Sequence, residues 1–290
     1  MGIVQAIVYG LVQGLTEFLP ISSNAHIRIV PSLLGWQDPG AAFTAVIQLG
    51  TVAAVLIYFA KDLGAAIKGW AASIAGEGKG TPEARMGWAV FWGTLPIILI
   101  GLALNNKIAT TFRSLYFIAF ALIGMGVVML LAEKLGKQTR KTKDVTVADG
   151  VKVGLWQVLA FIPGMSRSGS TISGALFGGF DRGSAARFSF LLSVPAVTAA
   201  GLYEAFKERH NFAGDLLVPT LVATVVSFAV GYASIAFLMK FLQKRGIVPF
   251  VAYRVLLGVV LLVLLSQGVL QPLSGVTSES SKPSAEGTAP

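Results

Sequence analysis

Two short polar segments interrupt an otherwise apolar sequence, and both carry residues that could do chemistry. The first segment holds Gln13, Glu17, Ser22, Ser23, His26 and Arg28. Gln13 and Glu17 are four residues apart, so they share one face of a helix. Ser23 and His26 are three apart and can lie together if a helix resumes after Pro20. A hydroxyl, an imidazole and a carboxylate at this range suit a nucleophile or an acid–base pair.

The second segment reads Pro163-Gly164-Met165-Ser166-Arg167-Ser168-Gly169-Ser170-Thr171. Its glycines, Gly164 and Gly169, permit close approach of the backbone to a ligand. The hydroxyls and the backbone NH groups at the start of a following helix can bind an anion. Arg167 supplies a planar fork that matches phosphate oxygens. The segment therefore predicts a phosphate cradle, although it lacks the GxxxxGK[ST] pattern of a Walker loop.

The composition says where these segments lie. Hydrophobic residues make up 54% of the 290 residues and charged residues 13%, against roughly 25% charged in soluble domains. The mean hydropathy is +0.72. The absence of cysteine excludes zinc ribbons, iron–sulfur proteins, thiol enzymes and disulfide scaffolds. The chain is too apolar for a nucleic-acid-binding protein, so the net charge of +9 is first a topology signal in an integral membrane protein.

Apolar stretches predict six membrane spans. About 20 helical residues cross a ~30 Å hydrocarbon core. The stretches of suitable length and low charge are 39–60, 86–106, 114–132, 188–203, 216–239 and 255–278. Arg254 precedes the last of them. We count it as a substrate contact that faces the cavity, with snorkelling to the membrane interface as the alternative.

The two polar segments fit badly as spans. Each follows a helix-length apolar piece, contains a proline and is followed by another short apolar piece. Irregular backbone at membrane depth is tolerated only inside protein or beside a cavity. We therefore predict two re-entrant helix hairpins, which bring the polar segments into the membrane interior.

The sequence repeats at an offset of about 144 residues. Gly10-Leu11-Val12-Gln13 aligns with Gly154-Leu155-Trp156-Gln157, and Ser23 aligns with Ser166 after a one-residue gap. Each half, about 1–135 and 150–270, then holds one hairpin and three spans. Because three is odd, the halves have opposite orientations, as in inverted-repeat transporters. The predicted fold is an all-α polytopic membrane protein, a single domain over 1–276 with a basic cytoplasmic linker at 136–149 and a disordered tail at 277–290.

Basic residues predict the orientation. If the linker is cytoplasmic, most of the 23 Lys and Arg residues lie on that face. The first hairpin then enters from outside and the second from the cytoplasm, so that their polar tips can meet.

These motifs resemble one known family. The run from Gln13 to Ser23, with His26, resembles the (E/Q)xxxE block of the undecaprenyl-diphosphatase family of the bacitracin-resistance type. The run from Pro163 to Thr171 is similar to that family's PGxSRSxxT block. The resemblance covers about residues 1–270. Two departures are Gln13, where many members have Glu, and Asn24-Ala25 in place of Thr-Gly.

The resemblance implies a function and a location. The expected reaction is hydrolysis of undecaprenyl diphosphate to undecaprenyl phosphate and inorganic phosphate, which recycles the lipid carrier for cell-wall synthesis and contributes to bacitracin resistance. The expected place is the bacterial inner membrane, with the active site opening to the periplasmic face. The alternative, suggested by the repeat, is a transporter or flippase of polyprenyl phosphate. Expected partners are the polyprenyl diphosphate and membrane lipids, without nucleic acid, and a homodimer is compatible with the sequence.

The resemblance and the residue chemistry together predict the site. The catalytic set is Glu17, Ser23, His26 and Arg167. The substrate-binding set is Gln13, Ser22, Gly164, Ser166, Ser168, Thr171 and Arg254. We expect Glu17 to orient His26, which moves the proton, and the nucleophile is Ser23, His26 or water. A Mg²⁺ or Ca²⁺ ion is expected to be held largely by the substrate, with Glu17 as its protein ligand.

Overall fold

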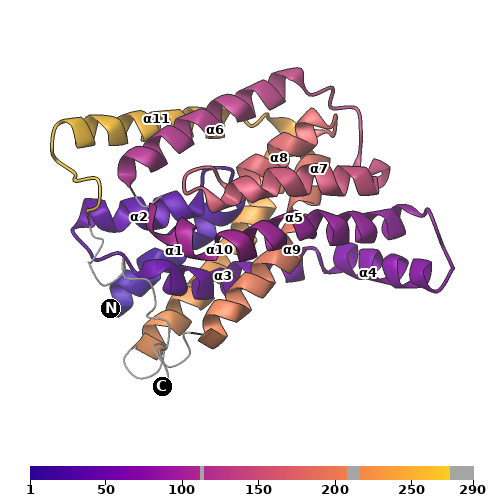
Figure 1. Ribbon diagram of the computed structural model, residues 1–290, viewed down its shortest axis with the longest axis horizontal. Helices are drawn as coiled ribbons and strands as arrows, with labels where there is room; N and C mark the ends of the chain where they lie inside the picture. Colours follow the sequence, from indigo (N-terminus) through magenta and orange to yellow (C-terminus); the bar gives the residue numbers. More distant parts are fainter. Residues whose placement is uncertain (112–113, 208–215, 275–290) are drawn as a thin grey trace.

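The computed structural model describes residues 1–111, 114–207 and 216–274, with side chains described except at 41 and 104–111 (Figure 1). Within these ranges the secondary structure is helical apart from one isolated bridge between Arg140 and Phe180. The first half contains α1 (Ile3–Phe18), α2 (Ser23–Leu34), α3 (Gly40–Tyr58), α4 (Ala60–Ile74), α5 (Pro82–Thr111) and α6 (Leu115–Leu135). The second half contains η1 (Thr142–Asp144), α7 (Val147–Gln157), η2 (Val158–Phe161), α8 (Arg167–Phe177), α9 (Arg182–Lys207), α10 (Leu217–Lys244) and α11 (Val248–Ser266).

The prediction of an all-helical polytopic membrane protein is confirmed. Among the described residues, five helices are long and apolar enough to cross a membrane: α5, α6, α9, α10 and α11. The sixth predicted span is reached only if α3 and α4, which meet at a bend of 77°, are counted as one. The last span begins at Val248 rather than at residue 255. The charge of Arg254 misled the prediction, because this side chain is buried inside the helical packing instead of marking a helix end.

Both polar segments break a pair of short helices, as predicted. The first break, residues 19–22, separates α1 from α2, and the second, residues 162–166, separates η2 from α8. These helices have 16 residues at most, so at ~1.5 Å per residue none crosses a ~30 Å core alone. Residues of α6 and α11 contact these breaks, and the turn of the chain at membrane depth stays a prediction.

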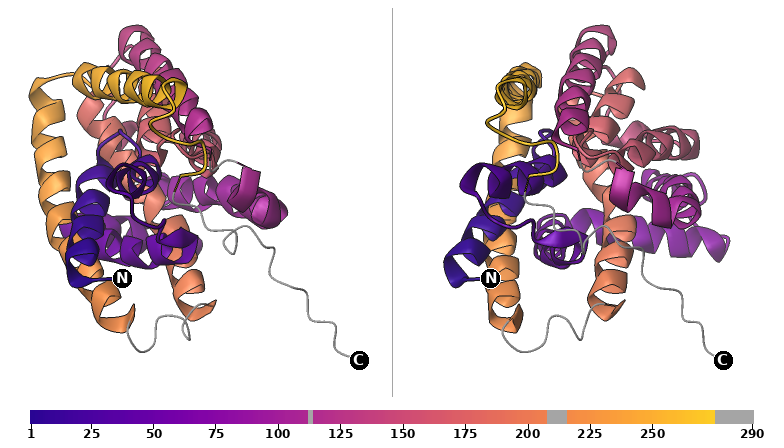
Figure 2. Two further views of the ribbon diagram at one scale, coloured as in Figure 1. Left: turned by 90° about the vertical axis from the view of Figure 1, so that its left-hand side faces the viewer. Right: turned by 60° about the vertical axis from the view of Figure 1, so that its left-hand side comes forward.

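The two halves make corresponding contacts. α1 packs along α10 as α7 packs along α5, while α3 touches α9 and α6 touches α11. Figure 1 shows α6 and α11 side by side, and Figure 2 shows α10 running past α1 along the height of the molecule. This pattern is what an internal repeat produces. The opposite orientation of the halves and the domain bounds stay predictions, and the predicted disordered tail at 277–290 lies outside the described residues.

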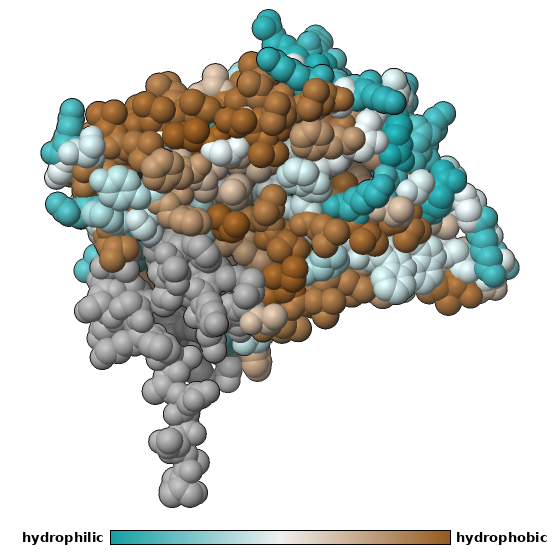
Figure 3. All heavy atoms as spheres, turned by 45° about the horizontal axis from the view of Figure 1, so that its top comes forward, coloured by the Kyte–Doolittle hydropathy of each residue, from teal (hydrophilic) through white to brown (hydrophobic). Residues whose placement is uncertain are grey.

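Hydrophilic and hydrophobic residues are distributed unevenly over the surface (Figure 3). Hydrophobic residues cover most of the face in Figure 3, and hydrophilic residues gather at the end where α6, the 136–149 linker and the α4–α5 connection lie. Arg140 organises this linker, since it binds both carboxylate oxygens of Asp149 and the carbonyls of Gly178 and Asp144. Burial alone would raise the pKa of Asp149, but its hydrogen bonds from Arg140 and Thr146 outweigh that effect and lower it.

Small residues set the distance between α5 and α7. A Cβ atom added to Gly154 would lie 2.1 Å from the carbonyl oxygen of Gly93, and one added to Gly150 would lie 2.2 Å from that of Ala89. Membrane helices, which lack a hydrophobic driving force for association, gain their stability from such close backbone contact. The glycines of α7 therefore allow the second hairpin to pack directly against the backbone of α5.

We predict that Gly154→Leu separates α7 from α5. The substitution lowers the free energy of unfolding by at least the ~1–3 kcal/mol typical of an overpacked core. Thermal unfolding in detergent therefore occurs at a clearly lower temperature. Gly124→Leu is the matched control, because a Cβ atom there meets nothing within 4 Å. Equal unfolding temperatures for the two variants would contradict the close-packing account.

Candidate active site

The two helix breaks end in the same unusual way. Ser22 precedes α2 with a φ of 77°, and Ser166 precedes α8 with a φ of 67°. Such a conformation costs a non-glycine residue about 1–3 kcal/mol and persists where the surroundings enforce it. By backbone conformation, Ser22 is therefore the counterpart of Ser166. The sequence alignment had made Ser23 the counterpart of Ser166, which is wrong by one position. Ser23 and Arg167 are consequently the first residues of their helices.

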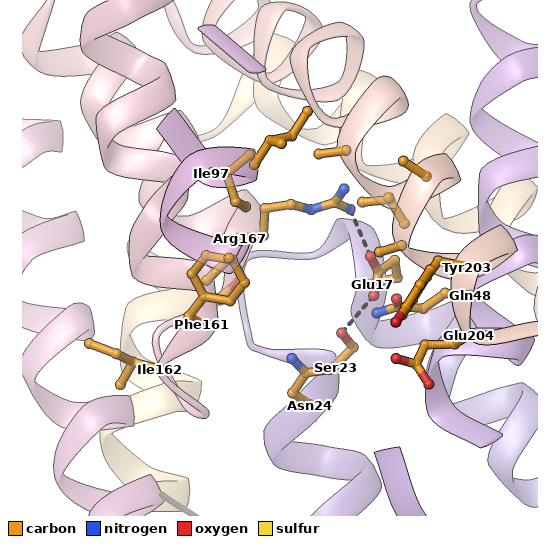
Figure 4. Close-up of a pocket in the computed structure, with 18 of the residues that line it drawn as sticks. Glu17, Ser23, Asn24, Gln48, Ile97, Phe161, Ile162, Arg167, Tyr203 and Glu204 are labelled. Carbon is orange, nitrogen blue, oxygen red and sulfur yellow. Dashed lines mark hydrogen bonds and ion pairs between the residues drawn. The ribbon is translucent and has the colours of Figure 1, made fainter. Parts of the chain in front are cut away.

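Glu17 is the meeting point of the two hairpins (Figure 4). Arg167 Nη2 lies 2.7 Å from Glu17 Oε1. Ser23 Oγ donates to Glu17 Oε2 over 2.6 Å, and Gln13 Nε2 donates to the same oxygen over 2.8 Å. Glu17 is only 6% exposed, so these contacts form inside the protein. The expected proximity of Gln13 and Glu17 is confirmed.

A cavity of about 510 Å³ opens over this cluster. Its polar end contains Glu17, Ser22, Ser23, Ser166 and Arg167. Its apolar wall comes from α5 and α9, with Ile97, Ile98, Gly101, Leu102, Ala196, Val197, Ala199 and Ala200. The cavity can therefore hold an amphiphile, with its polar head against the hairpin breaks and its apolar part between two long helices.

Arg167 has donor capacity to spare. Its Nη2 binds Glu17, whereas its buried Nη1 has no hydrogen-bond partner among the described residues. A buried charged donor without a partner is costly. Arg167 lines the cavity, so its guanidinium is the cationic group that an anion entering the cavity would meet.

The other residues of the second break support its shape. Ser166 Oγ caps α8 by accepting from Gly169 N at 3.1 Å, and Ser168 Oγ donates to Leu19 O at 3.2 Å. Thr171 Oγ1 contacts Ser189 Oγ and donates to Arg167 O. Gly164 has a φ of 99°, and an added Cβ would lie 2.7 Å from that of Ala121. Of these four residues only Ser166 lines the cavity, and binding of substrate by the other three stays a prediction.

His26 is not where the sequence predicted it. Its Nδ1 lies 2.7 Å from Ser22 O, and its Nε2 lies 2.7 Å from the Tyr253 hydroxyl. Because a carbonyl can only accept, Nδ1 carries the hydrogen, and Nε2 of the neutral ring accepts from Tyr253. Both nitrogens are occupied, so the expected contact between Glu17 and His26 is wrong. The first turn of α2 points His26 toward α11, and it is Ser23 that reaches Glu17.

Arg254 also lies elsewhere than expected. The side chain is fully buried and donates only to backbone carbonyls among the described residues. It neither lines the cavity nor snorkels to the membrane interface. Neither arrangement predicted from the sequence is found.

The structure adds cavity residues that the sequence reasoning missed. Gln48 of α3 and Glu204 of α9 line the cavity, and Asn24 lies beside Ser23 (Figure 4). An adjoining cavity of about 370 Å³ shares these three residues and reaches the buried Arg28–Asp38 ion pair. Glu204 carried one signal, since it is the charge that ends the apolar stretch 188–203.

The described part of the chain holds no cluster of metal-binding side chains. The described ranges contain no group of three or more His, Asp or Glu side chains that could hold a metal ion. Both oxygens of Glu17 already accept hydrogen bonds from Arg167, Ser23 and Gln13. A cation held by Glu17 would therefore share the carboxylate with these donors, and Oε1, which accepts only from Arg167 among the described residues, has a lone pair left for it.

Comparison with known proteins decides the family. The family described as "Bacitracin resistance protein BacA" matches residues 6–260. The chain belongs to this family. An undecaprenyl-diphosphatase of Myxococcus xanthus is 52% identical over 277 residues, covering 95% of this chain and 93% of that protein. The undecaprenyl-diphosphatase of Chloroherpeton thalassium is 52% identical over 284 residues, covering 93% and 99%.

A third relative has a similar name and nearly the same coverage. Undecaprenyl-diphosphatase 2 of Streptomyces coelicolor is 48% identical over 284 residues, covering 92% of this chain and 96% of that protein. The resemblance drawn from the two motif blocks is therefore confirmed, and both blocks lie within the matched range.

We predict strong coupling between Glu17 and Arg167. Arg167→Met leaves a buried carboxylate without its counter-charge, which costs about 3–5 kcal/mol. The double variant with Glu17→Gln removes that charge as well, so it is more stable than the sum of the single losses by ~1 kcal/mol or more. Reversible unfolding in mixed micelles of all four proteins measures this coupling. Strictly additive losses would mean that the pair contributes no interaction.

Proposed function

We propose that this protein hydrolyses undecaprenyl diphosphate to undecaprenyl phosphate and inorganic phosphate. The curated relatives that share about half of its residues carry the name of this activity. The observation that carries the proposal for this chain is the set of Ser23, Glu17 and Arg167 at the polar end of an otherwise apolar cavity. Recycling of the lipid carrier and bacitracin resistance follow from this activity.

Substrate binding uses both ends of the cavity. The diphosphate lies against the Arg167 guanidinium and the first NH groups of α8, whose N-terminus carries partial positive charge. Ser22 and Ser166 lie at the same end. The prenyl chain leaves between α5 and α9, where the wall is apolar.

Glu17 is the proton acceptor in this mechanism. Its Oε2 already accepts the hydrogen bond of the Ser23 hydroxyl over 2.6 Å, so the proton has a short path to the carboxylate. Its Oε1 is paired with Arg167 Nη2, and this ion pair holds the carboxylate in place. Because Arg167 also lines the cavity, the diphosphate can bind its guanidinium while the pair with Glu17 stays formed.

Ser23 is the nucleophile in the first step. Its Oγ attacks the terminal phosphorus, its proton passes to Glu17 Oε2, and the bond from that phosphorus to the bridging oxygen breaks. Undecaprenyl phosphate leaves with this oxygen, while Arg167 stabilises the charge that develops in transfer. Once undecaprenyl phosphate has left, Glu17 releases its proton to solvent. Water then attacks the phosphoserine, and Glu17 takes one proton from this water. Glu17 returns that proton to Ser23 Oγ as the bond between Oγ and phosphorus breaks and inorganic phosphate leaves. His26, whose nitrogens contact Ser22 and Tyr253, supports the backbone before Ser23 instead of attacking.

A divalent cation and the membrane location extend the proposal. A Mg²⁺ or Ca²⁺ ion held largely by the diphosphate is compatible with the site. The proposed reaction steps do not require this ion. The proposed location is the bacterial inner membrane, with the cavity open to the periplasmic face. The choice of face rests on the adjoining cavity, which reaches Asp38, between α2 and α3, away from the basic linker (Figure 1). A homodimer and lipid transport stay predictions.

We predict that Ser23→Ala, Glu17→Gln and Arg167→Ala each lower phosphate release by about 10²–10⁴-fold, the range for loss of a base, nucleophile or charge-stabilising group. The assay follows phosphate release from undecaprenyl diphosphate in detergent. Acid quenching of the native protein early in turnover traps phosphate on the peptide containing Ser23, detected by mass spectrometry.

Two results would separate the alternatives. Phosphate release without any phosphopeptide, together with Ser23→Ala activity within about tenfold of the native protein, would make water the nucleophile. Absence of release by the native protein would remove the hydrolase proposal itself.

We predict that Ala200→Trp blocks the apolar wall of the cavity. A bulky ring between α5 and α9 raises the KM for undecaprenyl diphosphate by about tenfold or more, since ~1.4 kcal/mol of lost chain burial corresponds to that factor. Farnesyl diphosphate, with a much shorter chain, is affected less. Leu202→Trp is the matched control, because Leu202 is exposed on α9 and does not line the cavity. An equal effect on both substrates would place the prenyl chain elsewhere.

A further inference from the structure

Arg254 is a fully buried cation in the interior of a membrane protein. Among the described residues its hydrogen bonds go only to backbone carbonyls. Nη1 donates to Pro20 O over 3.2 Å, and Nη2 donates to Gly164 O over 2.6 Å and to Met165 O over 3.3 Å. Nε donates to Leu122 O over 3.3 Å. A charge this costly to bury calls for a function.

The acceptors reveal that function. Pro20 lies two residues before Ser22, and Gly164 lies two residues before Ser166. Arg254 therefore binds the same position of both helix breaks, just ahead of the two serines with positive φ. Carbonyls freed from helical pairing at these breaks need donors, and a planar guanidinium can serve several at fixed angles.

We propose that Arg254 is a positioning residue that clamps the two helix breaks together. It touches neither the cavity nor Ser23 and Arg167. It acts through the intervening backbone, which sets where the first residues of α2 and α8 point. The neighbouring Tyr253 adds to this on the first hairpin, since its hydroxyl and ring contact His26.

This role makes the geometry of a guanidinium, and not merely its charge, the requirement. A lysine ammonium is a point charge on a flexible stem and cannot reach carbonyls of both breaks in fixed directions. Methionine has a similar apolar stem and no donors. The series Arg254, Arg254→Lys and Arg254→Met thus grades the clamp from complete to absent.

The kinetic test rests on the proposed function. Misplacement of reacting groups by about 1 Å costs about 10²-fold in rate, so Arg254→Met lowers kcat by about that factor. The KM for undecaprenyl diphosphate changes by less than about threefold, because the apolar wall on α5 and α9 is untouched. Arg254→Lys restores only part of kcat. The control is Arg187→Met, which removes a half-exposed arginine paired with Asp62, away from both breaks.

A structural test does not depend on catalysis. Amide hydrogen exchange followed by mass spectrometry should be faster in residues 19–23 and 162–167 of Arg254→Met and Arg254→Lys, with α10 unchanged. Unchanged exchange in both breaks, or a kcat for Arg254→Lys equal to that of the native protein, would overturn the clamp. If Arg254→Met does not fold, Arg254→Lys decides both readouts. If the native protein releases no phosphate, the proposed function is refuted. The hydrogen-exchange result then decides alone whether Arg254 clamps the two breaks.

Discussion

The ion pair between Glu17 and Arg167 is the contact on which the rest of the structure depends. It joins residues 150 positions apart in the sequence, and it forms where two helix breaks meet inside the protein. Withdrawing two charges from water is costly, and the cost is met only with good geometry and further hydrogen bonds. Gln13 and Ser23 supply such bonds to the carboxylate. The hairpins, the helices around them and the buried Arg254 all serve to hold these tips in register.

Local rules accounted for the elements and for part of the site. Long apolar runs predicted the membrane helices, and prolines within polar runs predicted the breaks, because the cost of burying backbone and charge acts on every residue. The four-residue spacing of Gln13 and Glu17 placed them together because both lie on one uninterrupted helix. The predicted start of the last span was wrong because the charge of Arg254 was taken to mark a helix end. The cost of burying this charge is offset by hydrogen bonds to backbone carbonyls that are distant in the sequence.

Contacts across the fold were beyond such rules. The spacing of Ser23 and His26 was compatible with a pair, yet the positive φ of Ser22 turns Ser23 toward Glu17 and leaves His26 to Tyr253, 227 residues away. Nothing local distinguishes a strained serine from an ordinary turn. Gln48 and Glu204 reach the cavity only through the packing of α3 against α9. Their place beside the cavity depends on tertiary packing. The spacing of residues along the sequence does not reveal such contacts.

The repeat predicted from the sequence accounts for how one scaffold can hold an asymmetric site. Both breaks place the first residue of a helix at the cavity, and these equivalent positions carry Ser23 and Arg167. Gln13 and Gln157 are also equivalent, and both are fully buried. Gln13 binds Glu17, four residues on, whereas Gln157 is followed at that distance by Phe161, and its amide has no partner among the described residues. A single carboxylate in one half thus converts a symmetric pair of breaks into a site with a base and hydroxyl on one side and an anion-binding cation on the other. Phosphoryl transfer requires the base and the cation to be on different sides of the site. The attacking oxygen and the leaving oxygen lie on opposite sides of the phosphorus, and the leaving oxygen carries the developing negative charge.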